Sequence, residues 1–267
     1  MMTGVPYMMR VIGFGFRRPK VPVRGMALAG VVEAVGPEAG TFRAGDEVCG
    51  VCRSGSFAEY AVARDGLLVP KPAGLSFEQA AALPVSGVTA LQAVRDQAKV
   101  RAGQHVMVIG AGGGVGTYVV QLAKAEGATV TAVCGPDKAD LARSIGADEV
   151  IDYTKGDFTN RISDIDLVLD PIGGEHAERS LKVIRNGGVL VSLLNLSDAT
   201  RALASARDIR VERMSVVPDR EGLVELGRLI DANKLTVHVA KSFPLEEAGA
   251  AHAFLATKPI GKVALTV

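Results

Sequence analysis

A glycine-rich stretch, GAGGGVG, occupies residues 110–116 and is the segment of the chain best suited to bind a ligand. Because glycine has no side chain, the backbone N–H groups of such a turn can approach a phosphate closely. The spacing is G-x-x-G-x-x-G rather than the strict G-x-G-x-x-G pattern. A flexible loop is the alternative meaning of this composition. The candidate contacts are Gly110, Gly112, Gly113, Gly114, Val115 and Gly116.

The segments on both sides of this turn favour the binding interpretation. Residues 105–109 are a short apolar, β-rich run, apolar residues recur at helical spacing from 115 to 122, and Gly127 stands where the helix would end. A second β-rich run follows at 128–134. Strand, glycine turn, helix and strand within about thirty residues are typical of a dinucleotide-binding βαβ unit, with the pyrophosphate on the helix N-terminus.

The end of the second strand bears on which dinucleotide is bound. Sites that prefer NAD place an Asp or Glu about twenty residues beyond the glycines, where it binds the ribose hydroxyls. This strand ends at Cys134 and Gly135 without an acid. Asp137 falls slightly late and is expected to cap a helix that begins near Pro136. Lys138 suits a 2′-phosphate, with a solvated surface lysine as the alternative. We therefore predict NADPH as the cofactor.

Composition excludes several classes of function. The chain has 267 residues, 48% of them hydrophobic, and a formal net charge of +1, so neither nucleic acid nor an anionic membrane is an expected partner. The basic cluster at residues 17–20 is too short to change this, and a solvated loop explains it better. Three cysteines argue against a disulfide framework. With no signal-peptide region and no membrane span in the sequence, we expect a soluble, cytoplasmic protein.

The segments before and after the glycine turn differ in the secondary structure that their sequences predict. Before the glycine turn, short β-rich runs at 29–36, 45–48 and 57–62 are punctuated by glycine, which predicts a compact, barrel-like β domain. Beyond the turn, apolar strands at 165–170 and 188–193 alternate with predicted helices, which is typical of a parallel sheet. From Leu235 onward the chain is expected to return to the β domain and complete it.

Motifs that occur in a fixed order then give the chain a family resemblance. They are RGMALAGVVEAVG at 24–36, FRAGDEV at 42–48, FAEY at 57–60, LPVSGVTAL at 83–91, GGVG at 113–116, IGADEVIDY at 145–153, FPLEEAG at 243–249 and GKVAL at 261–265. In this order they resemble the medium-chain dehydrogenase/reductase family. Within it, they are similar to the zinc-independent quinone oxidoreductase, or zeta-crystallin-like, branch.

The resemblance implies an α/β fold with two domains. A Rossmann doubly wound parallel sheet that binds NADPH is expected over residues 89–237, and a β-rich, GroES-like partial barrel over 1–88 and 238–267. It also implies a homodimer joined through the edge of the Rossmann sheet, and residues 191–194 and 210–217 are the candidates for that edge.

Further cofactor contacts follow from the resemblance. Lys138 and Tyr153 coincide with the lysine and tyrosine that hold the 2′-phosphate in these reductases, and Gly135 lies beside them at the tip of the second strand. Thr89, Ser192 and Leu193 match residues close to the cofactor. For Thr89, an ordinary threonine at a helix N-terminus is the alternative.

The same resemblance argues against a metal. Zinc-dependent relatives carry a His-Glu pair where this chain has Met26 and Ala27, and a zinc-binding cysteine near Val85. Their four-cysteine lobe is missing. Cys49 and Cys52 form a C-x-x-C pair that supplies half of a tetrahedral site, and we interpret it as a coincidence.

The beginning of the chain departs from the family pattern. Relatives carry several strands and a helix before the equivalent of Gly25, so we expect an N-terminally incomplete β domain, and no catalytic residue is assigned. The cause would be a start placed too late, a truncated gene or a rebuilt domain. The resemblance implies a zinc-independent reductase that passes hydride from NADPH to a quinone or a similar activated carbonyl or enone. The alternative is an NADPH-binding sensor or structural protein with little or no turnover.

Overall fold

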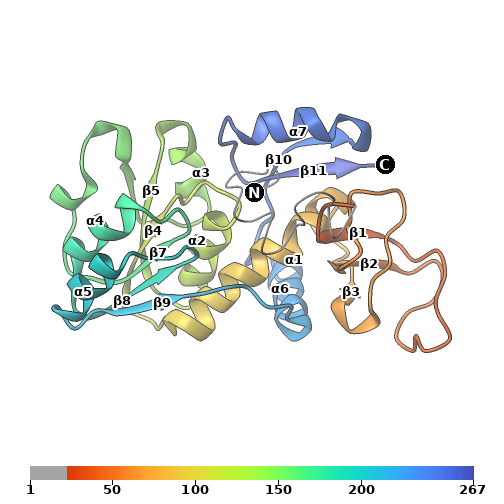
Figure 1. The fold of residues 1–267 in the computed structure, drawn as a ribbon, viewed down its shortest axis with the longest axis horizontal. Helices are drawn as coiled ribbons and strands as arrows, with labels where there is room; N and C mark the ends of the chain where they lie inside the picture. Colours follow the sequence, from red (N-terminus) through yellow and green to blue (C-terminus); the bar gives the residue numbers. More distant parts are fainter. Residues whose placement is uncertain (1–22) are drawn as a thin grey trace.

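The fold is described from a computed structural model of the chain, over residues 23–267. The basic cluster at 17–20 and the first part of the predicted 1–88 domain lie outside the described residues. Figure 1 shows a six-stranded sheet with its helices at one end, a small β sheet at the other, and the helix α1 (Phe77–Leu91) running between them.

The six strands are β4 (His105–Ile109), β5 (Thr129–Cys134), β6 (Glu149–Asp152), β7 (Ile165–Asp170), β8 (Ile184–Ser192) and β9 (Arg210–Arg213). They lie in the order β6-β5-β4-β7-β8-β9, and every neighbouring pair is parallel. The predicted doubly wound parallel sheet is confirmed. Strands β4 to β6 are added toward one edge of the sheet and β7 to β9 toward the other, so the order of the strands reverses between β4 and β7. Ligands of such sheets bind at that point, outside the carboxyl ends of the strands.

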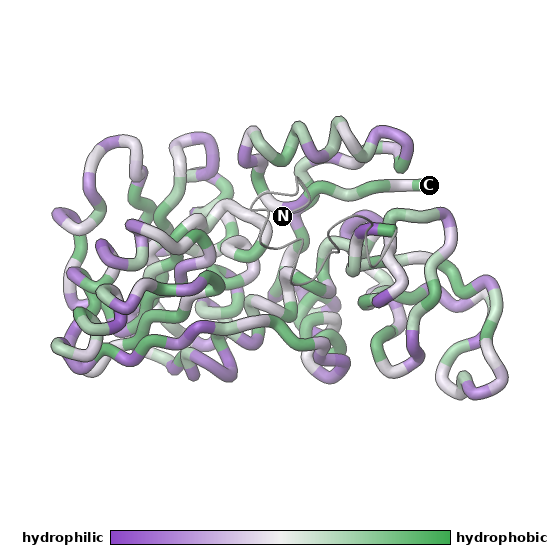
Figure 2. Tube along the Cα trace, viewed as in Figure 1, coloured by the Kyte–Doolittle hydropathy of each residue, from purple (hydrophilic) through white to green (hydrophobic). Residues whose placement is uncertain are grey.

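Both faces of the sheet are buried because helices cover each of them. Along β4, Val106 and Val108 belong to one buried cluster and Met107 and Ile109 to the other, as the two-residue period of a strand requires. The first cluster includes α2 (Gly116–Ala125), and the second includes α4 (Glu175–Val183) and α5 (Asp198–Ser205). Along the chain, α3 (Ala139–Ser144) connects β5 to β6. In Figure 2 the strands are mostly green, and hydrophilic segments gather in the loops.

Helix α1 begins at Phe77, before the LPVSGVTAL motif at 83–91. Ser76 and Gln79 form a reciprocal capping box that starts the helix, with Ser76 accepting from the Gln79 N–H at 3.3 Å and Gln79 accepting from the Ser76 N–H at 3.1 Å. Pro84 lies inside the helix. The helix continues as a π-helical segment, Gln92–Ala98. Thr89 therefore lies in the last turn of α1, and its alternative reading as a helix N-terminal threonine is wrong.

The other end of the molecule contains two small sheets. β1 (Ala27–Val31), β2 (Glu47–Val51) and β3 (Leu68–Pro70) form an antiparallel sheet. β10 (Val239–Pro244) and β11 (Lys262–Thr266) are parallel and joined by α7 (Ala248–Leu255). The run at 57–62 forms bends rather than the expected strand. The C-terminal segment returns to this end as expected, but its strands pair with each other and not with β1–β3.

The two outer strands of the large sheet are β6 and β9, while β8 lies between β7 and β9. Residues 191 and 192 are therefore internal, and of the two predicted edge segments only 210–217 contains an edge strand. None of the helices within residues 23–267 is long and apolar enough to cross a membrane.

The crossing of α1 and α6 (Arg220–Asp231) yields a stability prediction. Leu226 is fully buried, and its Cδ1 lies 3.0 Å from the position that a Cβ on Gly87 would occupy. Leu226→Ala should lower the free energy of unfolding by about 2–5 kcal/mol in urea, because it leaves a cavity where the helices meet. The control is Leu203→Ala on α5, where Leu203 is 55% exposed, and it should cost less than about 0.5 kcal/mol. Equal effects of the two variants would contradict this packing.

The three cysteines yield a second prediction. Cys49, Cys52 and Cys134 are buried and unpaired, and burial raises the pKa of the Cys49 thiol to about 11. Native protein at pH 8 should react with Ellman's reagent only slowly, whereas protein in guanidinium should release three equivalents at once. Rapid labelling of one or two thiols in the native state would instead favour a reactive C-x-x-C pair.

Candidate functional site

The glycine turn is a close-packed structure rather than a flexible loop. The N–H groups of Gly110 and Ala111 donate to the Val133 carbonyl at 2.9 and 3.2 Å, and Gly113 N–H donates to Gly110 O at 2.9 Å. Gly110 has φ of +67°. A Cβ on Gly116 would lie 2.3 Å from Gly110 O. Side chains are therefore excluded at the first and last glycines for two different reasons, backbone conformation and backbone contact.

The turn leaves backbone donors without acceptors. Thr117 N–H donates to Gly113 O at 3.1 Å, but the N–H groups of Gly114, Val115 and Gly116 have no acceptor within residues 23–267. Val115 is the N-cap of α2 and gives it no side-chain cap. A ten-residue helix with a positive N-terminal end and free donors is a suitable site for a phosphate group.

Lys138 lies against this turn. A Cβ on Gly112 would come within 2.7 Å of the Cβ and Cδ of Lys138, so the aliphatic part of the lysine crosses the turn at Gly112. Lys138 ends a 3₁₀ turn, Pro136–Lys138, that connects β5 to α3. The expectation that Asp137 caps this segment is wrong, because the N-cap positions are Gly135 and Lys138 and neither helix has a side-chain cap.

Tyr153 belongs to the same neighbourhood. It begins the 3₁₀ turn Tyr153–Lys155 after β6, and it is 47% exposed. Its hydroxyl lies 3.7 Å from the position that a Cβ on Gly135 would occupy. Because β5 and β6 are parallel neighbours, their carboxyl ends meet at one edge of the sheet. The structure thus brings Gly135, Lys138 and Tyr153 together beside the glycine turn.

The other predicted contacts lie elsewhere. Ser192 is the last residue of β8 and Leu193 follows it, two strands away from β4. The Ser192 hydroxyl is buried, donates to Leu194 O at 3.2 Å and accepts from Leu194 N–H at 3.2 Å. Thr89 is also buried, and its hydroxyl donates to Val85 O at 2.6 Å. All three residues are outside the glycine cluster, and the two hydroxyls already have partners.

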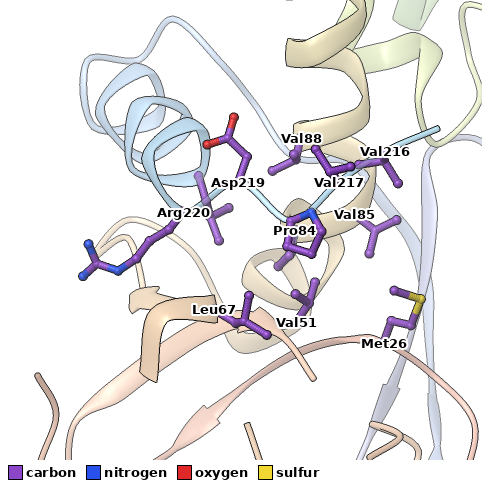
Figure 3. A pocket seen from close by; sticks show the side chains of 12 residues that line it. Met26, Val51, Leu67, Pro84, Val85, Val88, Val216, Val217, Asp219 and Arg220 are labelled. Carbon is purple, nitrogen blue, oxygen red and sulfur yellow. The ribbon is translucent and has the colours of Figure 1, made fainter. Parts of the chain in front are cut away.

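A pocket lies where α1, α6 and the small β sheet meet (Figure 3). Ten of the side chains that line it are apolar: Met26, Val51, Leu67, Pro84, Val85, Val88, Val216, Val217, Pro218 and Leu223. The remaining two are Asp219 and Arg220. Met26 and Val85, which stand where zinc ligands are expected in metal-dependent relatives, are both among the lining residues. No group of three or more His, Cys, Asp or Glu side chains suited to a metal ion occurs within residues 23–267.

The two charged residues of this pocket are engaged by the protein itself. Asp219 accepts the Gly222 N–H at 2.8 Å and pairs with Arg95 at 2.9 Å. Arg220 Nε donates to Leu68 O at 3.1 Å, and Figure 3 shows its side chain extending away from the apolar group. No lining residue is therefore an uncommitted acid or base.

Two features of the site were missed from the sequence. The apolar pocket combines residues far apart in the chain, so no local signal marks it. Lys262 is the second: a Cβ on Gly114 would lie 2.5 Å from its Cδ, and the only sequence signal was its position after Gly261 in the terminal motif. Around the turn, Gly112, Gly114 and Gly116 form a close-packed cradle, because Cβ atoms on them would meet Lys138, Lys262 and the Gly110 carbonyl. The N–H groups of residues 114–116, which have no acceptor within residues 23–267, are the groups of this cradle that fit the pyrophosphate of a dinucleotide.

Comparisons with known families agree with the two-part architecture. Residues 4–73 match the alcohol dehydrogenase GroES-like domain, and residues 145–265 match the zinc-binding dehydrogenase family. The second name describes the family model, and the described residues contain no cluster of metal ligands.

Individual relatives are similar over most of the chain. The spectinabilin polyketide synthase system protein NorB of Streptomyces orinoci is 36% identical over 256 residues, which are 91% of this chain and 12% of NorB. Mouse quinone oxidoreductase is 30% identical over 256 residues, 88% of this chain and 77% of the relative.

A solved structure gives the same result. The structure of Escherichia coli quinone oxidoreductase complexed with NADPH has a TM-score of 0.85 and 27% identity, and the match covers 98% of this chain and 88% of that one. On these matches, and with a doubly wound sheet beside a GroES-like region, the chain belongs to the medium-chain dehydrogenase/reductase family, with quinone oxidoreductase homologues.

Proposed function

We propose that this protein is an oxidoreductase that transfers hydride from NADPH to a quinone or a similar activated carbonyl or enone, without zinc. The main observation behind this proposal is that the protein combines two features. One is the glycine cradle with Lys138, and the other is an apolar pocket, with no cluster of metal ligands among the described residues. When bound, the nicotinamide supplies the hydride, and the protein's part is to orient it and to limit the access of water.

The residues of the cradle would share the work of binding the dinucleotide. The free N–H groups at 114–116 would hold the pyrophosphate at the N-terminus of α2. Lys138 and Tyr153 would hold a 2′-phosphate, since an ammonium and a hydroxyl beside Gly135 can both donate to its oxygens. Thr89, Ser192 and Leu193 are proposed to lie near the nicotinamide.

The choice of NADPH rests on the groups at the end of β5. Lys138 supplies a cation there, and it packs on the glycine turn itself. The one acid of that loop is Asp137, next to Gly135, and a carboxylate in this place favours the free hydroxyls of NADH. Lys138 therefore favours NADPH and Asp137 favours NADH. We propose that the effect of Lys138 is the larger, because its aliphatic part is fixed against Gly112.

The character of the pocket supports an acceptor that needs little activation. Hydride transfer to a quinone gives an anion that takes one proton from water to form the hydroquinone, so no protein acid is required. Asp219 and Arg220 are committed to structural bonds, in line with this chemistry. An unactivated carbonyl would need a Lewis acid or a proton donor, and the lining residues offer neither.

Association through the large sheet is part of the proposal. β9 is one of its two outer strands, and a second copy could pair with it and extend the sheet, which would remove one exposed edge. Residues 210–213 would then lie at the centre of the homodimer.

The direct test is oxidation of NADPH by purified protein with a small para- or ortho-quinone, and with an enone in parallel. We expect quinone turnover, faster than enone turnover, with kcat/KM for NADPH at least about tenfold above that for NADH. NADH preference would overturn the cofactor assignment. Tight NADPH binding without turnover of either acceptor would favour the alternative, a binding protein with little activity.

A second test isolates the 2′-phosphate contact. Lys138→Met keeps the aliphatic chain over Gly112 and removes the charge, so the Kd for NADPH should rise about tenfold while the Kd for NADH stays within about twofold. Quenching of protein tyrosine fluorescence or calorimetry would measure both. Lys155→Met is the matched control, because the Lys155 side chain is 77% exposed and lies on the neighbouring turn. Equal weakening of NADPH and NADH by Lys138→Met would contradict the role.

A further inference from the structure

The segment between β9 and α6, residues 214–219, supplies one wall of the apolar pocket. Its residues 216–218 line the pocket together with Val85 and Val88 of α1 (Figure 3). The segment contains no helix or strand, and Val217 is 59% exposed. An exposed segment without regular structure has little packing of its own, so hydrogen bonds must determine where this wall lies.

Both ends of the wall segment are fixed. At one end, the Met214 N–H donates to the Ser192 carbonyl at 3.0 Å. At the other end, Asp219 caps α6 and pairs with Arg95 at 2.9 Å. The residues between them, 215–218, form no backbone–backbone hydrogen bond within residues 23–267. The middle of the wall therefore depends on side chains of the neighbouring elements.

The side chain of Gln92 holds this middle part. Its Nε2 donates to the Val217 carbonyl at 2.9 Å, and its Oε1 accepts the Val217 N–H at 3.2 Å. One amide thus satisfies both backbone groups of Val217, as a residue of a neighbouring antiparallel strand would. Gln92 is only 6% exposed, which shields this pair of bonds from water.

The position of Gln92 ties the wall to the helix across the pocket. Gln92 follows α1 directly, as the first residue of the π-helical segment, and it comes one turn after Val88 and two turns after Val85. The three side chains therefore lie along one face of the helix. The valines line the pocket, and the amide holds the backbone of the wall beside them. The length of the Gln92 side chain thus sets how far apart the two walls are.

Resting on the proposed function, we propose that Gln92 is a positioning residue that sets the width of the acceptor pocket and so selects acceptors by size. Gln92 itself is not among the lining residues, so it acts through the wall and not on the acceptor. With the amide in place, the narrow pocket suits a single-ring quinone. Without it, the ends of the wall stay fixed and its middle moves outward, so a small acceptor is held less well and a fused-ring acceptor fits better.

Gln92→Met tests this role, because it keeps the length of the side chain and removes both hydrogen bonds. The KM for para-benzoquinone should rise about tenfold, with kcat changed less than about threefold, and the KM for phenanthrenequinone should fall. The Kd for NADPH, measured without acceptor, should stay within about twofold of the wild-type value. A general loss of structure would weaken both acceptors and the cofactor together.

The matched control is Gln97→Met, the same substitution on the same π-helical segment. The Gln97 side chain forms no hydrogen bond within residues 23–267, and its backbone carbonyl accepts from Arg210 at 3.1 Å. This variant should keep the wild-type ratio of kcat/KM for the two quinones. An unchanged ratio in folded Gln92→Met would overturn the inference. Failure of the proposed function is a separate result, because the wild-type protein would then turn over neither quinone.

Hydrogen exchange on unaltered protein covers the case in which Gln92→Met does not fold. The N–H groups of Ser215 and Val216 have no acceptor within the described residues, whereas the Val217 N–H is bonded to Gln92. Followed by NMR and corrected for intrinsic rates, the Val217 N–H should exchange at least about tenfold more slowly than the other two. Equal exchange of the three N–H groups would also overturn the inference, since Gln92 would then not hold the wall.

Discussion

The close approach of two backbone segments at the glycine turn is the constraint on which the site depends. Gly116 begins α2 so near to the Gly110 carbonyl that a Cβ there would lie 2.3 Å from it, and this contact sets where the helix leaves the sheet. The N–H groups of residues 114–116, which have no acceptor within residues 23–267, lie at the same helix start. Lys138 and Lys262 then use the space left by two further glycines. A single side chain in the cradle would displace the helix, a lysine stem or both.

The local elements were predictable from the sequence because short-range rules determine them. The runs at 105–109 and 165–170 are apolar throughout, as strands covered on both faces require, and they form β4 and β7 within these bounds. Gly127 has φ of +80° after α2, in agreement with its predicted role as a helix stop. The run at 57–62 has the composition of a strand, but no strand within residues 23–267 pairs with it, and residues 57–60 form bends instead.

In the candidate site, too, residues placed by local rules were predictable and residues brought together by long-range contacts were not. Gly135, Lys138 and Tyr153 could be predicted as neighbours because consecutive parallel strands end at one edge of the sheet, and the sequence carries each residue just after a strand. The pocket could not, since it joins Met26 before β1, Val51 of β2, helix α1, the segment after β9 and helix α6. Lys262 could not either: it lies well over a hundred residues after Gly114, and the backbone contacts of Gly261 with Gly112 and Gly113 bring the two together.

The central helix α1 links these two regions and limits the chemistry. Val85 and Val88 on α1 line the pocket, and Leu83 and Gly87 pack against Leu226 of α6 on another side of the same helix. Arg95, just beyond α1, forms ion pairs with Asp219 and Glu225 of the α6 region, so the carboxylate of Asp219 is engaged by the protein although it lines the pocket. With apolar side chains where a metal-dependent site would have ligands, the protein can position two reactants but cannot polarise a carbonyl through the lining residues. On the function proposed above, the acceptor would have to bring its own electron deficiency, which favours quinones and conjugated carbonyls over simple ketones.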